Sequence, residues 1–246
     1  IKLTDEIYQK GEKEKNSPQM LKAYAWRMKY REMLNPDSLY AGLKGLEQWV
    51  KQTDQPMDRA ILHSLIAGIY ANYAANNQWQ LRQRTEIVGQ TPSADIREWT
   101  ANMFVEKVRT NVKEALADSV LLLKTSSRDY IPFVELGKTS EYYHHDLYHL
   151  LASRGIDALL QVEKLGSGYT ETNAVNPVKQ DIIAIYGNML SAYKAAGLKE
   201  GYVLTALNYL DWRRGAERYI RPLQVKGEAS VLTDDTYLKA LNTLKS

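Results

Sequence analysis

The chain has 246 residues, of which 44% are hydrophobic and 25% charged, and its formal net charge is +3. A chain of this length forms one large domain or two small ones with a substantial core. The lack of cysteine excludes disulfide frameworks, thiol nucleophiles and cysteine-based zinc sites. The weak net charge argues against nucleic-acid binding, and no apolar run approaches the length of a membrane span.

Helical periodicity dominates the N-terminal part. Ser17 and Pro18 form a start signal, a capping hydroxyl followed by proline at the first helical position, and we expect a helix to about Leu34. It carries two apolar stripes, one of Leu21, Tyr24, Ala25 and Met28 and the other of Trp26, Tyr30 and Met33. Because a surface helix normally shows one stripe, two stripes predict packing on both sides, as in stacked helical hairpins. A second helix is expected from about Asp37 to Lys51.

The third predicted helix runs from about Asp58 to Asn76. Its large apolar stripe contains Leu62, Leu65, Ile66, Ile69 and Tyr73, and a second stripe of mostly small residues contains Ile61, Ser64, Gly68, Ala71 and Ala75. Small side chains allow a neighbouring helix to approach closely, so core packing is expected there, with a ligand groove as the alternative. A capping box at Asp95 and Glu98 predicts that a further long helix starts nearby, with apolar positions at Trp99, Val105, Val108, Val112 and Leu116.

The segment from Tyr142 to Leu160 supports two hypotheses. His145 and His149 are four residues apart, the spacing that places two imidazoles on one face of a helix, as in zinc hydrolases. However, the position after His145 is Asp146 rather than glutamate, and the sequence shows no clear third ligand. The same segment has a broad apolar arc with Asp146 on the opposite face, as in a core helix. We therefore predict no catalytic residue, metal or cofactor, and keep His145 and His149 as the alternative zinc ligands.

Residues 165–176 are rich in Gly, Ser, Thr and Asn and predict a linker. It would separate a helical array at 1–164 from further hairpins at 177–246, unless the two form one continuous domain. A helix is expected from Asn176-Pro177 to Gly197, followed by a partner helix from about Lys199. Residues 204–210 and 238–244 resemble each other at an offset of 34 residues, which equals the tetratricopeptide (TPR) period. Together these patterns predict an all-α fold of stacked helical hairpins, an α-solenoid of TPR-like type.

A basic and aromatic segment follows within the partner helix. If it is helical throughout, its arginines align on one face, and Arg and Trp are common in protein-binding hot spots. A solvated helix end before Pro222 is the alternative, because arginine near a helix C-terminus favourably meets the helix dipole. The candidate partner-binding residues are Trp212, Arg214, Arg218 and Arg221.

Several segments, in the same order, resemble one protein family. They are residues 17–30, residues 60–73 with Asn77-Gln-Trp79 and Arg84-Thr85, residues 95–99 and residues 147–157. They are similar to the N-terminal helical region of the very large alpha-2-macroglobulin-like envelope proteins of Bacteroidetes. The likeness is best over about 17–160 and thinner over 177–214. The chain departs from the family pattern at His149, where the family has Asp, and at Ser153, where it has His.

The resemblance implies a non-catalytic scaffold or protein-interaction region at the start of a larger, exported, peptidase-trapping protein of the periplasm or outer membrane. Its partners would be other domains of the parent chain and peptidases. The family's thioester needs a cysteine that this chain lacks. The chain begins with Ile1, so we expect a mature or trimmed segment without its export signal. The alternatives are a free-standing TPR-like binding module and a zinc hydrolase using His145 and His149.

Overall fold

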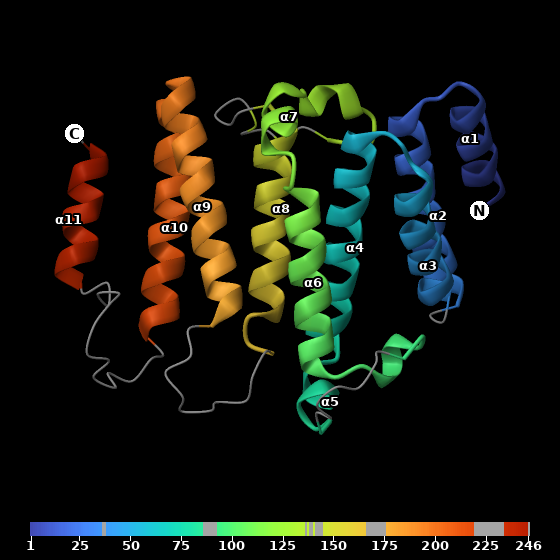
Figure 1. Cartoon of the computed structure of the whole chain (residues 1–246), viewed down its shortest axis with the longest axis horizontal. Coiled ribbons are helices and arrows are strands. Elements are labelled where there is room, and N and C mark those ends of the chain that lie inside the picture. Colours follow the sequence, from blue (N-terminus) through green and yellow to red (C-terminus); the bar gives the residue numbers. More distant parts are fainter. Residues whose placement is uncertain are drawn as a thin grey trace. The chain divides into compact units, whose positions relative to one another are not determined.

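The computed structural model describes residues 1–35, 38–85, 93–135, 137, 140, 145–165, 176–218 and 234–245 (Figure 1). Helices account for the regular structure in these ranges, which contain no β-strand and a single isolated bridge between Ser126 and Asp146. The predicted all-α class is therefore confirmed. Each helix in these ranges is too short or too polar to cross a lipid bilayer.

The chain divides into two compact units, residues 1–138 with 145–170 and residues 139–144 with 171–246. The described part of the first unit contains eight α helices and two short 3-10 helices. They are α1 (Lys2–Lys13), α2 (Ser17–Leu34), α3 (Ser38–Gln52), α4 (Pro56–Asn76), α5 (Gln78–Arg82), η1 (Ile96–Glu98), α6 (Ala101–Ala115), α7 (Ser119–Lys124), η2 (Ser127–Tyr130) and α8 (Leu147–Val162). Helix α1 is not predicted from the sequence.

Helix α4 lies at the centre of the first unit and packs against α3, α6 and α8 (Figure 1). Its Tyr70 ring stacks on Trp99 with the centroids 5.2 Å apart and meets Phe104 of α6 edge-on at 6.2 Å. Phe104 and Leu62 are fully buried. Burial of side chains of this size contributes about 1.5–3 kcal/mol each, so this centre is the main apolar core of the unit.

Two predicted helix starts differ from the structure. The N-cap of α2 is Asn16, whose side chain accepts a hydrogen bond from the Gln19 amide at 3.1 Å, and not Ser17. Asp95 caps η1 by accepting from the Arg97 amide at 2.9 Å, so the capping box with Glu98 is wrong and α6 begins only at Ala101. In both places a residue with a capping side chain lies close to the predicted start, and the sequence pattern does not distinguish which oxygen points back at the helix.

Ser17 has a different role, because it belongs to a buried polar cluster. Its hydroxyl donates to Asp58 Oδ2 at 2.5 Å, and the Tyr130 hydroxyl donates to Asp58 Oδ1 at 2.9 Å. Asp58 is 4% exposed. A buried carboxylate needs such donors to offset its lost hydration. This side chain therefore joins the first turns of α2 and α4 to η2.

The second unit contains α9 (Pro177–Ala196), α10 (Lys199–Arg218) and α11 (Asp234–Lys245) in its described residues. Asn176 caps α9, and Gly197 ends it in the left-handed conformation with φ +70°, as the sequence predicts. Helix α10 packs against α9 as a helical hairpin and also contacts α11. Most of the predicted linker, residues 166–175, lies outside the described residues. The solenoid arrangement and the boundaries 1–164 and 177–246 stay predictions.

Candidate interaction surface

The inner face of α2 fixes the orientation of the helix. Leu21 is fully buried, and the Tyr24 hydroxyl donates to the Gly42 carbonyl of α3 at 2.8 Å. On another side, Arg27 donates to Asp5 of α1 at 3.1 Å. Its guanidinium carbon also lies 4.6 Å from the centre of the Tyr24 ring, a distance at which a cation is attracted to an aromatic face. Helix α2 is thus held between α1 and α3.

The outer face of α2 is an exposed apolar surface. Trp26, Tyr30 and Met33, here called the α2 stripe, have exposed fractions of 38%, 40% and 73%, and Leu34 at the helix end is 77% exposed. The Trp26 and Tyr30 rings stack with their centroids 5.5 Å apart. Helix α2 has neighbours on two sides, α1 and α3, but the prediction that its second stripe is packed is wrong within the described residues, because this stripe is exposed.

Positive charge lies beside the α2 stripe. The Lys29 ammonium lies 4.8 Å from the centre of the Trp26 ring, and Lys22 lies one turn before Trp26 and pairs with Glu135 at 3.4 Å. The helix as a whole carries four basic residues, Lys22, Arg27, Lys29 and Arg31, and one acidic residue, Glu32. A partner with carboxylates beside apolar side chains would complement this face.

Exposed tryptophan and tyrosine on a helix held in place are suited to protein recognition. Each ring offers a large apolar area at low cost in side-chain entropy, and such residues are enriched in binding hot spots. Since α1 and α3 already fix α2, little backbone ordering would oppose association. The sequence reveals this surface only as a second apolar stripe, a signal that core packing produces equally well.

The structure does not place His145 and His149 on one helical turn. Helix α8 begins at Leu147, with Asp146 as its N-cap, so His145 precedes the helix. Asp146 is buried rather than on a solvent face. It accepts from the His149 amide at 2.7 Å and lies 2.8 Å from His149 Nδ1. The His145 carbonyl accepts from the Ser127 amide at 2.7 Å. The register behind the zinc hypothesis is therefore wrong, and no group of three potential ligands is arranged for a metal in the described part of the chain.

The predicted partner-binding residues near the end of α10 are described only in part. Trp212 stacks on Tyr186 of α9 at 6.2 Å and on Tyr209 at 6.1 Å, so it belongs to an aromatic cluster that joins α9 to α10. Arg214 is half-buried on the same helix. The side chain of Arg218 and the whole of Arg221 lie outside the described residues, so the predicted arginine face, like a binding role for Trp212, stays a prediction.

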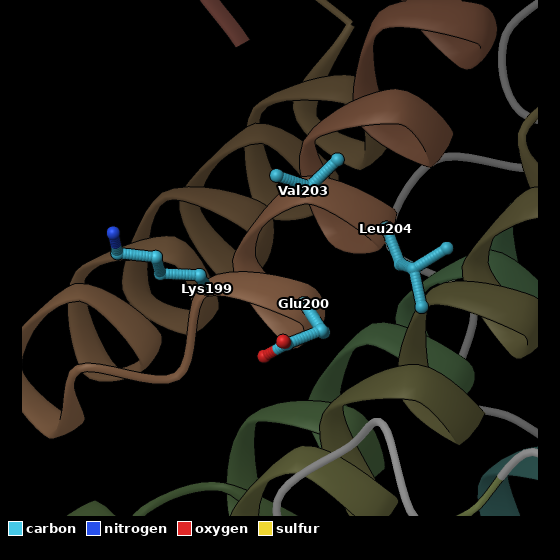
Figure 2. Close-up of a pocket in the computed structure, with 4 residues that line it drawn as sticks. All are labelled: Lys199, Glu200, Val203 and Leu204. Atoms are coloured by element: carbon cyan, nitrogen blue, oxygen red, sulfur yellow. The ribbon is translucent and has the colours of Figure 1, made fainter. Parts of the chain in front are cut away.

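A hollow of about 420 Å³ lies beside the first turns of α10 (Figure 2). Its described lining consists of Lys199, Glu200, Val203 and Leu204. Residues at this spacing lie on one face of one helix. The described residues therefore do not surround a ligand there.

Comparison with family models, curated proteins and solved structures finds no match to this chain. The resemblance to the macroglobulin-like proteins therefore rests on the quoted sequence segments.

Proposed function

We propose that this chain is a non-catalytic helical protein-interaction region and that α2 presents its docking surface. The observation that carries the proposal is the exposure of Trp26, Tyr30 and Met33 on a helix whose other sides are fixed by α1 and α3. Scattered exposed apolar residues are ordinary, but residues adjacent on one helix face form a patch of the kind that proteins use for association.

The proposed occupant is an acidic, apolar surface of another domain of the parent protein. Lys29 supports the acidic character, because its ammonium lies against the Trp26 ring of the α2 stripe. The parent is proposed from the sequence resemblance, which makes this chain the N-terminal part of an exported macroglobulin-like envelope protein that traps peptidases. Peptidases are the second proposed class of partner.

The test has a genetic and a biophysical part. The native reading frame is expected to continue into β-rich domains, and these domains, expressed separately, are expected to bind the 246-residue chain in calorimetric titrations. Met33→Glu should weaken binding at least tenfold, because it places a carboxylate within the apolar contact. Val120→Glu is the matched control, since Val120 is also exposed, at 64%, but lies on α7. It should leave binding unchanged.

The outcomes separate the two parts of the proposal. A reading frame without β-rich domains would reject the macroglobulin assignment and favour a free-standing binding module. Equal binding by Met33→Glu and the native chain would reject α2 as the docking surface while leaving the assignment intact.

A further inference from the structure

A cleft between α4 and α8 lies apart from the α2 stripe. Its volume is about 250 Å³. The segment that follows η2 closes one side. Six of its lining residues are apolar: Ile61, Leu65, Phe133, Val134, Leu150 and Leu151. It therefore offers an apolar hollow of a defined, small size within the first unit.

The cleft carries one cation at its edge. Arg154 of α8 lies on the exposed side of the helix, and its Nε donates to Ser64 Oγ at 3.2 Å. Its guanidinium also lies over the small stripe of α4, because a Cβ added to Gly68 would be 3.9 Å from Arg154 Nη2. Ser64 and Gly68 of the predicted small stripe thus lie against α8, which packs closely on α4, and at Gly68 the missing side chain leaves room for the arginine head.

Arg154 has no carboxylate within salt-bridge distance among the described residues. The acidic residue of the lining, Glu135, is directed to Lys22 at 3.4 Å. Asp157, one turn further along α8, is near enough to influence Arg154 but not to pair with it. The single serine bond uses one of the five N–H donors of the guanidinium. Two of the remaining N–H donors are available to a bound carboxylate, in the bidentate geometry that arginine forms with carboxylates.

The size of the cleft indicates how much of a ligand it can hold. Pockets that enclose a complete small-molecule ligand usually measure about 300–1,000 Å³. At about 250 Å³, this cleft suits a single aliphatic side chain, with the remainder of the ligand outside. A peptide that ends in an aliphatic residue has that side chain next to a free carboxylate, so both features can be used at once.

We infer that the cleft between α4 and α8 binds the carboxyl terminus of a peptide segment with an aliphatic last residue, with its carboxylate on Arg154. The side chain of the last residue enters the hollow between Leu65 and Leu151, and the preceding residues extend into solvent. This inference goes beyond the proposed function and is tested separately from it, because the residues proposed to bind the peptide lie on α4 and α8 and not in the α2 stripe.

The test is calorimetric titration of the full 246-residue chain with an N-acetylated pentapeptide that ends in Ala-Leu. The peptide with a free carboxylate is expected to bind, and its C-terminal amide at least tenfold more weakly. Arg154→Met, which keeps the apolar stem, should lose the same factor. Arg154→Lys should lose less, because a lysine keeps the charge but not the fork geometry. Arg128→Met, a change of another exposed arginine of this unit, should bind as the native chain does.

Four results would overturn the inference. They are no binding of the acid peptide, equal binding of acid and amide by the native chain, unchanged binding by Arg154→Met, and binding of free N-acetyl-leucine as tight as that of the peptide. The last result would assign the cleft to small carboxylic acids. The comparison of acid and amide uses the native chain and does not depend on the folding of any variant.

Discussion

Tyr130 shows how one hydroxyl can contribute to several parts of this fold. It donates to the buried carboxylate of Asp58 from a position 72 residues further along the chain. Burial, the charge of Asp58 and the hydrogen bond to it all raise the pKa of the Tyr130 hydroxyl above its ordinary value. The proton on this oxygen is thus part of the folded structure.

Tyr130→Phe should lower the free energy of unfolding by about 1–3 kcal/mol, because it leaves one oxygen of a buried carboxylate without its donor. Tyr30→Phe is the matched control. Tyr30 is 40% exposed, so its hydroxyl is open to water and the change should be nearly neutral. Guanidinium denaturation followed by circular dichroism measures both. Equal stabilities of the two variants would contradict the structural role of the Tyr130 bond.

The same group predicts how stability depends on pH. An unfolded tyrosine ionises near pH 10, whereas folded Tyr130 keeps its proton to higher pH. Above about pH 10 the folded state binds more protons, so the free energy of unfolding falls as pH rises, by at most about 1.4 kcal/mol per pH unit for one such group. Burial and the neighbouring Glu47 raise the pKa of Tyr70 in the same direction. Denaturation series between about pH 8 and 11 should therefore show a shallower decline for Tyr130→Phe than for the native chain. Parallel curves would contradict this.

At the scale of elements, the sequence predicts most long helices to within a few residues. Periodicity with a Ser-Pro or Asn-Pro start signal suffices for α2 and α9, and periodicity alone for α4, which begins at Pro56. Helix α1 was not predicted, and its buried positions are Thr4 and Gly11 rather than a stripe of large apolar residues. The predicted start of α8 is wrong because Asp146 is a buried N-cap. The periodicity of apolar residues does not distinguish such a cap from a carboxylate that faces solvent.

Replacing glycine by alanine should have opposite effects on stability at Gly155 and at Gly187. A Cβ at Gly155 would lie 2.9 Å from Val112 Cγ1, so Gly155→Ala forces α8 from α6 and should destabilise the chain by about 1–3 kcal/mol. Gly187 of α9 has open space around its Cα. Gly187→Ala should stabilise the chain by up to about 1 kcal/mol through helix propensity. Thermal unfolding of the two variants measures the difference, and two shifts of the same sign would contradict the packing of α8 on α6.

At the scale of the whole molecule, the candidate site was less predictable than the fold. The sequence shows that Trp26, Tyr30 and Met33 lie on one helix face, but the same pattern arises when a neighbouring helix covers that face. Which face is covered depends on how α1 and α3 approach α2, through Asp5, Gly42 and other residues distant in sequence. Similarly, the small stripe of α4 did not reveal that Arg154 would lie across Gly68.

Association through α2 should weaken as salt increases, because charge around the α2 stripe contributes to it. The screening length falls from about 10 Å at 0.1 M salt to about 3 Å at 1 M. Calorimetric titration with the proposed downstream domains at both concentrations is expected to show weaker binding at high salt, with a smaller difference for Lys29→Ala. The apolar contribution of Met33 should persist at both. Binding that strengthens with salt, or an unchanged salt effect in Lys29→Ala, would contradict the charge complementarity.

The cluster around Asp58 has a consequence for the motions of the first unit. Ser17, Asp58 and Tyr130 belong to three separate segments. An opening that frees Asp58 removes the acceptor of both hydroxyls, and one that frees Ser17 or Tyr130 leaves the Asp58 carboxylate with one of these two donors. Local fluctuations at these three places are therefore coupled, although they are far apart along the chain. Phe133, Val134 and Glu135, which close one side of the cleft, follow Tyr130 closely in the chain. The hydrogen bonds of Asp58 to Tyr130 and Ser17 therefore limit the motion of this side of the cleft and of the start of α2 together.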